Sequence, residues 1–471
     1  MITDFLINGE FRHSTKSSFE VIRPVDGTTL CTLPSASIED VKAAVAAAKN
    51  AFETWRFTDE LERQRLMFKW ADLLEERAET IAEQVAADSG TPVEGPRGTI
   101  TKIATMARYY GGLAVQNYGR VLSLADSHLN FVVRDPIGVV ALMPPWNSPL
   151  EATMQKLGPA LAAGNTAVIR APESGPCGAL LVAQCAHDAG FPAGVVNAIV
   201  GEDPASGIAL VEHPDIRLVS FTGSVPTGKA IAKSCAAQMK RYVMELGGKS
   251  PLIVFADADL DKAVADAVTW AFCYQGQICC ANTRILVEES IREEFTARVV
   301  AKTKELKMGL PGSDYPLGPL FNRKVFETVS KYVEIGKIDG QLLAGGEPIE
   351  TEKGFYYPPT IFAFNDTSSA VCQEEIFGPV LALIGFETED EAIQIANETR
   401  YGLAATVYSG DRARIFRVVR RLESGTVWAN CCFQFNIHMP WGGPKDTGQG
   451  REFGEYAIRP YYEEKNVWLG A

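Results

Sequence analysis

The sequence is poor in the residues that build metal sites and histidine-dependent sites. Its 471 residues include only five histidines, and no two of them stand at a metal-ligand spacing. The ten cysteines are scattered and form no Cys-x-x-Cys pair. A zinc site needs clustered Cys and His ligands, and a cysteine hydrolase generally pairs its thiol with a histidine. The sequence therefore predicts no metal centre and disfavours a histidine-activated thiol.

Long apolar runs and clustered positive charge are also absent. No hydrophobic stretch approaches the roughly 18 residues of a membrane span, and residues 1–10 lack the basic and apolar regions of a secretory signal. The formal net charge is −13, whereas nucleic-acid binding needs clustered Lys and Arg. We therefore expect neither a membrane nor nucleic acid as a partner. The scattered cysteines favour a reducing cytoplasm.

The first part of the chain has helical patterns typical of a scaffold. A hairpin is predicted around Asn8-Gly9. Ser37 and Asp40 have the spacing of a helix capping box, and Ser89-Gly90 is a helix-ending pair. The periodicity of apolar residues predicts three helices, over residues 37–52, 59–88 and 99–115.

From residue 130 onward, strand and helix patterns alternate. The apolar run 138–143 is typical of a strand buried on both faces of a parallel sheet. Strands are predicted over 131–134, 138–143, 166–169, 195–200 and 218–221, and helices over 151–163, 177–189, 205–212 and 227–236. This alternation predicts an open, doubly wound α/β sheet, with its ligand crevice at the carboxyl ends of the strands.

A second alternation runs from about residue 251 to residue 428. Its strands are predicted at 251–255, 284–287 and 380–384, and its helices at 260–273, 291–306 and 323–336. The two α/β blocks join near Gly247-Gly248. Residues 466–469 form a short apolar strand that needs a pairing partner, for which the edge of another subunit is one candidate.

One stretch places a thiol directly after a glycine-containing turn: Tyr274-Gln-Gly-Gln-Ile-Cys279-Cys280. A thiol is a useful nucleophile only as thiolate, a form that backbone N–H groups at a helix start or a nearby base would favour. Free cysteines are also common as small buried hydrophobic residues. By residue type alone, Cys279 and Cys280 are either core residues or a nucleophile with its neighbour.

Asn147 and Glu245 are candidates to assist such a nucleophile. The prolines of Met143-Pro-Pro-Trp-Asn147-Ser-Pro149 would hold the Asn147 amide in one place. A rigid N–H donor suits an oxyanion site, although Asn-Ser-Pro is also typical of a helix cap. Glu245 precedes Leu-Gly-Gly, and in an apolar cleft its pKa would rise toward that of a general base. An ordinary loop carboxylate is the alternative.

Three further stretches have the character of a nucleotide site. Phe221-Thr-Gly-Ser-Val-Pro-Thr-Gly228 would bring backbone N–H groups and a helix dipole to a phosphate, although no Gly-x-Gly-x-x-Gly fingerprint occurs. Arg170 and Glu173 follow a predicted strand and would contact ribose hydroxyls, or else form a solvated charge pair. Gln373-Glu-Glu375-Ile-Phe377-Gly-Pro places acidic residues beside an aromatic residue at a turn.

In this order, these stretches resemble the aldehyde dehydrogenase superfamily over essentially the whole chain. The matching motifs are Pro145-Trp-Asn147, Phe221-Thr-Gly-Ser224 with Gly228, Glu245-Leu-Gly-Gly, Gly276-Gln-Ile-Cys279, Glu375-Ile-Phe377-Gly-Pro and Gly442-Gly-Pro-Lys-Asp-Thr-Gly-Gln-Gly-Arg-Glu452. The resemblance implies a Rossmann-like cofactor domain (1–118 and 137–247), a second α/β catalytic domain (248–446), and a small β oligomerisation arm with a tail (119–136 and 447–471). It also implies a homodimer or homotetramer built through that arm.

The resemblance assigns the reaction to four side chains. Cys279 would attack the aldehyde carbon as thiolate, and the Asn147 side chain and the Cys279 backbone N–H would hold the oxyanion. After hydride passes to nicotinamide, Glu245 would draw a proton from the water that hydrolyses the thioester. Lys156 matches a lysine assigned to proton relay, with a surface lysine as the alternative. Cys280 is then only the neighbour of the nucleophile.

The implied cofactor is NAD, and use of NADP stays open. Glu173 matches the acidic residue of NAD-preferring members, because a carboxylate repels a 2′-phosphate. Arg170 stands where a lysine is usual, and its positive charge would instead favour the 2′-phosphate of NADP. Glu375 and Phe377 match residues that hold the nicotinamide ribose and ring. The other implied cofactor contacts are Pro145, Trp146, Phe221, Gly223, Ser224, Thr227, Gly228 and Leu246.

The implied substrate tunnel favours a bulky apolar or aromatic aldehyde. Its predicted lining is Ser148, Glu151, Ala152, Gln155, Ile278, Cys280, Phe433, Phe435 and Trp441. Ser148 replaces the aromatic residue common after Trp-Asn, which widens that wall. A cationic aminoaldehyde competes if Glu151 points inward. We expect Glu151 to face solvent in the first turn of its helix, where the dipole favours a carboxylate.

Three other functions compete with an NAD-dependent enzyme that hydrolyses its thioester. A coenzyme-A-acylating relative is disfavoured by Glu245, because relatives of that kind generally lack this base. A thiol acyltransferase or hydrolase without nicotinamide is disfavoured by the scarcity of histidine. An inactive structural relative is disfavoured because Cys279, Asn147 and Glu245 are all intact.

Overall fold

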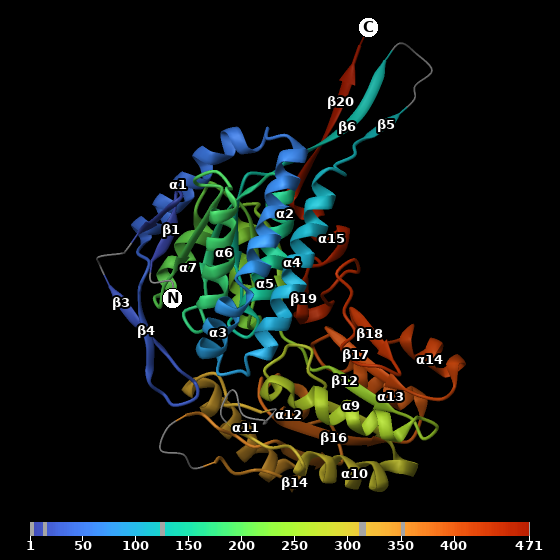
Figure 1. Ribbon diagram of the computed structural model, residues 1–471. Coiled ribbons are helices and arrows are strands. Elements are labelled where there is room, and N and C mark those ends of the chain that lie inside the picture. Colours follow the sequence, from blue (N-terminus) through green and yellow to red (C-terminus); the bar gives the residue numbers. More distant parts are fainter. Residues whose placement is uncertain (1–3, 13–16, 123–127, 310–316, 350–353, 471) are drawn as a thin grey trace.

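The computed structural model describes residues 4–12, 17–122, 128–309, 317–349 and 354–470. Within these ranges the chain forms two large sheets flanked by helices and a narrow β arm that projects from the body (Figure 1). The predicted α/β class is confirmed. In the described part of the chain, no helix combines the length and apolar character needed to cross a membrane.

The first sheet has the order β19-β11-β10-β7-β8-β9-β1-β2. Its strands are β1 (Phe5–Ile7), β2 (Glu10–Arg12), β7 (Val139–Met143), β8 (Thr166–Ala171), β9 (Val196–Val200), β10 (Ile216–Thr222), β11 (Arg241–Glu245) and β19 (Gly448–Gln449). Strands β7 to β11 are parallel, whereas β1 and β19 pair antiparallel with β9 and β11. The buried strand predicted at 138–143 is confirmed as β7, but β11 was not predicted.

The largest difference between the predicted and the observed helices around the first sheet is a break in the second helix. They are α1 (Ile38–Trp55), α2 (Glu60–Glu76), α3 (Ala78–Ser89), α4 (Glu94–Ala114), α5 (Pro149–Ala162), α6 (Cys177–Ala189), α7 (Pro204–Glu212) and α8 (Val225–Ala237). The capping box of Ser37 and Asp40 is confirmed. The single helix predicted over 59–88 is wrong, because the chain breaks at Arg77. Unbroken, that helix would span about 45 Å, and the break lets both halves pack on α4 and α6.

The second sheet has the order β14-β15-β16-β13-β12-β17-β18 and is parallel apart from β14. Its strands are β12 (Pro251–Val254), β13 (Arg284–Glu288), β14 (Gln341–Ala344), β15 (Thr360–Phe364), β16 (Val380–Phe386), β17 (Ala404–Tyr408) and β18 (Thr426–Ala429). Its helices are α9 (Leu260–Phe272), α10 (Arg292–Lys304), α11 (Arg323–Asp339), α12 (Ala370–Gln373), α13 (Glu389–Asn397) and α14 (Arg412–Val419). A second α/β unit is thus confirmed.

A separate hairpin, β3 (Ser18–Ile22) with β4 (Thr29–Pro34), lies beside the first unit (Figure 1).

The arm is a three-stranded antiparallel sheet of order β20-β6-β5. Its strands are β5 (Arg120–Leu122), β6 (Leu129–Pro136) and β20 (Tyr462–Leu469), and short helix α15 (Gly454–Ile458) precedes β20. Figure 1 shows the carboxyl terminus at the tip of this arm. The tail strand is longer than the predicted 466–469, because all of β20 pairs with β6 of the same chain. Residues 123–127 of the predicted arm lie outside the described residues.

Candidate active site

The carboxyl ends of parallel strands gather polar residues at one edge of the first sheet. Thr222 ends β10 in register with Glu245, which ends β11, and β7 beside them leads directly into residues 144–148. Cys279 comes from the second unit, in the loop between α9 and β13. A cleft of about 1710 Å³ lies here, and Asn147, Glu245 and Cys279 all line it. The cleft occupies the position that a parallel sheet predicts for its ligand.

The loop before Cys279 has a backbone that few residues adopt. Tyr274 and Gln275 have left-handed φ angles of 50° and 56°, and Gly276 follows with 69°. A Cβ on Gly276 would lie 2.3 Å from the carbonyl oxygen of Gly378. Only glycine fits this position, which accounts for the turn that precedes the thiol.

Gln277 ties the nucleophile loop to Asn147. The Nδ2 of Asn147 donates to the backbone oxygen of Gln277 at 2.9 Å. The side chain of Gln277 is buried, and its Oε1 accepts from the backbone N–H of Phe321 at 2.9 Å. One N–H of the Asn147 amide is therefore bound to the backbone of Gln277, which lies two residues before Cys279. The other N–H has no partner among the described residues and is available to an anion in the cleft.

The surroundings of Cys279 favour the thiol over the thiolate. A hydrogen bond that the Cys279 thiol donates to the side chain of Cys280, together with burial and the charge of Glu375, raises the pKa of Cys279 well above its usual value. The chain after Cys279 enters β13 without an intervening helix, so this segment offers the thiolate no helix N-terminus. A base must therefore take the proton. Cys280 is buried, as expected for a neighbour without a chemical role.

Glu245 is a buried carboxylate with an unused oxygen. The residue is 4% exposed, and Oε1 makes no hydrogen bond to any part of the chain that the structure describes. Burial, followed by the charge of Glu452, raises the pKa of Glu245 well above its usual value, and the nearby Cys279 acts in the same direction. A Cβ on Gly442 would lie 2.2 Å from that oxygen, so glycine is required beside it. A raised pKa makes the carboxylate form of this group a stronger base, one that can draw a proton from water.

Lys156 is an internal residue, and the alternative of a surface lysine is wrong. Its side chain has no exposed area, forms an ion pair with the carboxylate of Glu452, and donates to Thr222 Oγ1 at 2.7 Å. Glu452 is itself 3% exposed, and it exchanges backbone hydrogen bonds with Trp441. The sequence reasoning assigned Glu452 no role, although it ends the last of the quoted motifs. The pair places a buried positive charge close enough to Glu245 to act on its pKa.

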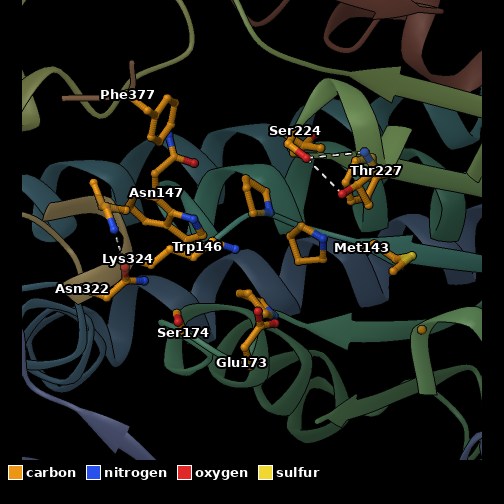
Figure 2. Close-up of a pocket in the computed structure, with 18 of the residues that line it drawn as sticks. Met143, Trp146, Asn147, Glu173, Ser174, Ser224, Thr227, Asn322, Lys324 and Phe377 are labelled. Carbon is orange, nitrogen blue, oxygen red and sulfur yellow. Dashed lines mark hydrogen bonds between the residues drawn. The ribbon is translucent and has the colours of Figure 1, made fainter. Parts of the chain in front are cut away.

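The walls of the cleft hold nearly all the predicted cofactor contacts. Figure 2 shows the segment from Met143 to Asn147 along the cleft, with Ser224 and Thr227 on one side and Glu173 on the other. The Trp146 ring packs on Phe321 and edge-on against Phe377, with ring centres 4.3 Å and 5.3 Å away. The other predicted contacts that line the cleft are Pro145, Arg170, Phe221, Gly223, Leu246 and Glu375. Gly228 lies behind the wall, packed on Leu246.

The N-terminus of α8 faces the cleft and has the features of an anion-binding site. Ser224 is the N-cap, and its Oγ accepts from the backbone N–H of Thr227 at 3.5 Å. The early N–H groups of a helix and its dipole favour a phosphate at such an end. A Cβ on Gly228 would lie 2.5 Å from a methyl carbon of Leu246, so glycine lets the helix approach the wall.

Glu375 lies against the junction of the two units. Its Oε1 accepts from the backbone N–H of Gly248 at 3.1 Å, and a Cβ on Gly247 would lie 2.1 Å from Oε2. Burial raises the pKa of Glu375 to about 7. The carboxyl group is thus held by a glycine pair and changes its charge near neutral pH.

Arg170 and Glu173 have different surroundings. Arg170 is mostly buried, and its guanidinium donates to the backbone oxygen of Gly201 at 2.8 Å and to Ser206 Oγ at 3.3 Å. Glu173 is exposed at the mouth of the cleft, 3.8 Å from the nearest guanidinium nitrogen of Arg170. Arg170 is therefore engaged with the protein, whereas Glu173 is available to a ligand.

The predicted substrate residues lie apart from the cofactor cleft. Ser148, Glu151, Ala152, Gln155, Ile278, Cys280, Phe433, Phe435 and Trp441 are all absent from the cleft wall. Phe435 lies edge-on to Trp441 with ring centres 5.0 Å apart. The expectation that Glu151 faces solvent is wrong, because Lys102 Nζ donates to its Oε1 at 2.6 Å and only 20% of the side chain is exposed. Lys102 comes from α4, which the sequence reasoning treated as scaffold.

Several cleft residues were missed by the sequence reasoning. Asn322 and Lys324 at the start of α11 face Trp146 (Figure 2), and Asp26 and Gly27 come from the turn between β3 and β4. These residues lie far from the motifs in the sequence, and no local pattern distinguishes them from ordinary turn and helix-start residues.

The comparisons with known proteins cover almost the whole chain. The family model described as "Aldehyde dehydrogenase family" matches residues 11–467. Betaine aldehyde dehydrogenase of Bacillus subtilis (strain 168) is 38% identical over 478 residues, which cover 99% of this chain and 97% of that protein. This identity extends through both α/β units.

Two solved structures are nearly superimposable on this fold. The NAD+ complex of aldehyde dehydrogenase from Bacillus cereus has a TM-score of 0.97 at 38% identity and covers 100% of this chain and 97% of its own. Indole-3-acetaldehyde dehydrogenase AldA of P. syringae, solved with NAD+ and IAA, has a TM-score of 0.96 at 37% identity and covers 99% and 96%. The chain therefore belongs to the aldehyde dehydrogenase family.

Proposed function

We propose that the protein oxidises an aldehyde to the carboxylic acid with NAD, through a thioester on Cys279 that water hydrolyses. One observation carries the proposal: the thiol of Cys279, the Asn147 amide and the buried Glu245 line the same cleft. The family membership and the NAD+ complexes of similar structures support it. The predicted bulky apolar or aromatic substrate is retained as part of the proposal.

The cleft fits NAD in its donors and its shape. The N-terminus of α8, with Ser224 and Thr227, would hold the pyrophosphate, and Glu375 and Phe377 would hold the nicotinamide ribose and ring. Gly247 leaves space for Glu375, where a Cβ would fill the site. NAD when bound supplies a hydride acceptor beside Cys279. The protein supplies the nucleophile Cys279, the hydrogen-bond donor Asn147 and the base Glu245.

We infer a preference for NAD over NADP from the exposed Glu173 and the mostly buried Arg170. The exposed carboxylate of Glu173 accepts hydrogen bonds from ribose hydroxyls and repels a 2′-phosphate. Arg170, which would favour that phosphate, has its guanidinium bound to Gly201 and Ser206. The ratio of kcat/KM for NAD to that for NADP should therefore exceed one, and it should fall in Glu173→Gln.

The first covalent step belongs to Cys279 and Asn147. Because the thiol has a raised pKa, its proton passes to water in the cleft as the sulfur attacks the aldehyde carbon. The oxyanion then receives the second N–H of the Asn147 amide and the backbone N–H of Cys279. Hydride leaves the resulting thiohemiacetal, and an acyl group remains on Cys279.

Hydrolysis then depends on Glu245 acting on water. The buried carboxylate draws a proton from a water that attacks the thioester carbonyl, and the acid leaves as Cys279 is released. We propose that the buried ion pair of Lys156 with Glu452, whose charges act on the pKa of Glu245, passes that proton onward, as the resemblance implies for Lys156.

The arm offers edges for assembly. We infer a homodimer or homotetramer built through it, because β5 and β20 are the outer strands and Trp468 and Leu469 are exposed on β20. Light scattering should give at least twice the mass of one chain, whereas a monomer would contradict the inference. We also infer a cytoplasmic location, because the ten cysteines are all free and a reducing compartment keeps thiols in that form.

Replacing the thiol tests the proposed function. Cys279→Ala should abolish NADH formation with every aldehyde in a panel of aliphatic, aromatic and amino aldehydes. It should leave NAD binding, measured by calorimetry, within about twofold of the unsubstituted protein, a change of less than 0.5 kcal/mol. Cys280→Ala is the matched control and should retain turnover. NADH formation by Cys279→Ala would refute the assignment.

A further inference from the structure

An ion pair joins α4 to α5 beside the predicted substrate residues. Lys102 Nζ donates to Glu151 Oε1 at 2.6 Å, and Gln155 Nε2 donates to the same oxygen at 3.3 Å. The Lys102 and Glu151 side chains are only 30% and 20% exposed. A pair shielded in this way is screened less by salt than a surface pair, so Lys102 and Glu151 attract each other more strongly.

The ammonium group of Lys102 also lies at the rim of an aromatic cluster, which we define as Trp270, Trp428, Phe433, Phe435 and Trp441. Its Nζ is 5.0 Å from the centre of the Phe435 ring and 5.4 Å from that of Phe453. A cation at this distance is attracted to the ring face. The aromatic cluster therefore ends in a positive charge on the side of α4.

The position of Glu151 on α5 relates this ion pair to the nucleophile. Glu151 lies in the first turn of α5, and Asn147 lies just before the Ser148 N-cap of the same helix. Glu151 and Gln155 are the two residues of α5 that are not fully buried, so they share its one open face. An aldehyde whose carbonyl lies between Asn147 and Cys279 would extend along this face toward Lys102.

We propose that Lys102 is a specificity-determining residue that selects aromatic aldehydes bearing an anionic substituent and rejects cationic aldehydes. The proposal rests on the function proposed above. Lys102 neutralises Glu151, which removes the attraction that this carboxylate would have for an aminoaldehyde. The ammonium has three N–H donors and gives one to Glu151, so two can serve a substrate carboxylate. The aromatic cluster would stack on the ring of the substrate.

Kinetics with three probes test the proposal: 4-carboxybenzaldehyde, benzaldehyde and betaine aldehyde. In Lys102→Met, the ratio of kcat/KM for 4-carboxybenzaldehyde to that for benzaldehyde should fall about tenfold or more, as expected for one lost charge-assisted hydrogen bond. The ratio for betaine aldehyde to benzaldehyde should rise by about tenfold, because Glu151 is left unneutralised. Lys102→Arg keeps the charge and should keep both ratios.

The double variant Lys102→Met with Glu151→Gln separates the two effects. In the double variant, the kcat/KM ratio for 4-carboxybenzaldehyde to benzaldehyde should still fall. The ratio for betaine aldehyde to benzaldehyde should not rise, because no carboxylate remains to attract a cation. If Lys102→Met lowers kcat/KM for all three probes equally, Lys102 is structural and the proposal is overturned. Preference of the unsubstituted protein for betaine aldehyde would also overturn it.

Binding without turnover distinguishes this proposal from the proposed function. In Cys279→Ala, tryptophan fluorescence should report tighter binding of 4-carboxybenzaldehyde than of benzaldehyde, and adding Lys102→Met should remove the difference. Failure of the unsubstituted protein to form NADH with any aldehyde would refute the proposed function. An equal affinity of the two probes in Cys279→Ala, with NADH formation intact, would refute the role of Lys102 alone.

Discussion

The cofactor cleft and the aromatic cluster with Lys102 are built in different ways. The cleft depends on glycines with no space for a Cβ, such as Gly247 against Glu375 and Gly276 against the backbone of Gly378. The aromatic cluster depends on large side chains, such as Phe435 and Trp441. Backbone packing fixes the first region, whereas side-chain identity defines the second. We expect the cleft to tolerate few changes and the aromatic cluster to change its ligand while the fold stays intact.

The largest effect should come from the base at the catalytic end of the cleft. Glu245→Gln keeps the size of the side chain but cannot take a proton, so steady-state turnover should fall by about 100-fold or more. Stopped-flow measurement of NADH should then resolve a burst of about one equivalent per site, because hydrolysis becomes the slow step. Glu151→Gln, a carboxylate outside the cleft, is the matched control and should show no such burst. Equal loss of the burst and the steady state would mean that Glu245 acts before the thioester forms.

The next effect tests whether backbone packing governs the cleft. Gly247→Ala places a Cβ 2.1 Å from the Glu375 carboxylate, which must move. Overpacking of this kind costs about 1–3 kcal/mol, so NAD should bind about 5- to 100-fold more weakly. Gly98→Ala is the matched control, because a Cβ there meets nothing within 4 Å. Calorimetry measures the NAD affinity of both variants. Equal affinities would contradict the claim that backbone packing governs the cleft.

A smaller effect should appear in the pH dependence of NAD binding. Burial raises the pKa of Glu375 to about 7, so it is neutral below that pH and a carboxylate above it. The carboxylate accepts hydrogen bonds from ribose hydroxyls more strongly than the acid does, so NAD affinity should rise up to about tenfold between roughly pH 6 and pH 8. Glu375→Gln should remove this dependence. An unchanged profile in that variant would assign the titration to another group.

The smallest effect concerns the aromatic cluster. Phe435→Leu removes an aromatic ring that packs edge-on to Trp441, a contact worth about 1 kcal/mol. The KM for an aromatic aldehyde should rise about fivefold, while NAD affinity and the melting temperature change little. A parallel loss of NAD affinity would show that the two regions are not independent.

The sequence predicted the parts of the site that depend on local backbone. Gly276 before Cys279 and the N-cap Ser224 are readable, because a left-handed turn and a helix cap each restrict the residue type. The two α/β blocks were predicted from buried apolar runs, since a strand such as β7 must be apolar on both faces.

The remainder depends on packing between elements that are distant in the sequence. Lys156 lies on α5, a helix buried almost all round, so no polar face distinguishes an internal lysine from an external one. The pairing of Lys102 with Glu151 requires the contact between α4 and α5, which no local pattern encodes. The helix break at Arg77 was missed because neither proline nor glycine marks it.

The central claim is that Cys279 carries an acyl group that Glu245 helps water to remove. Mass spectrometry of Glu245→Gln, mixed with NAD and benzaldehyde and quenched after the NADH burst, tests it most directly. We predict a mass increase that corresponds to one benzoyl group per chain, located on the peptide that contains Cys279 and absent when NAD is omitted. An unmodified Cys279 after a full burst, or an acyl group on Cys280 instead, would contradict the account.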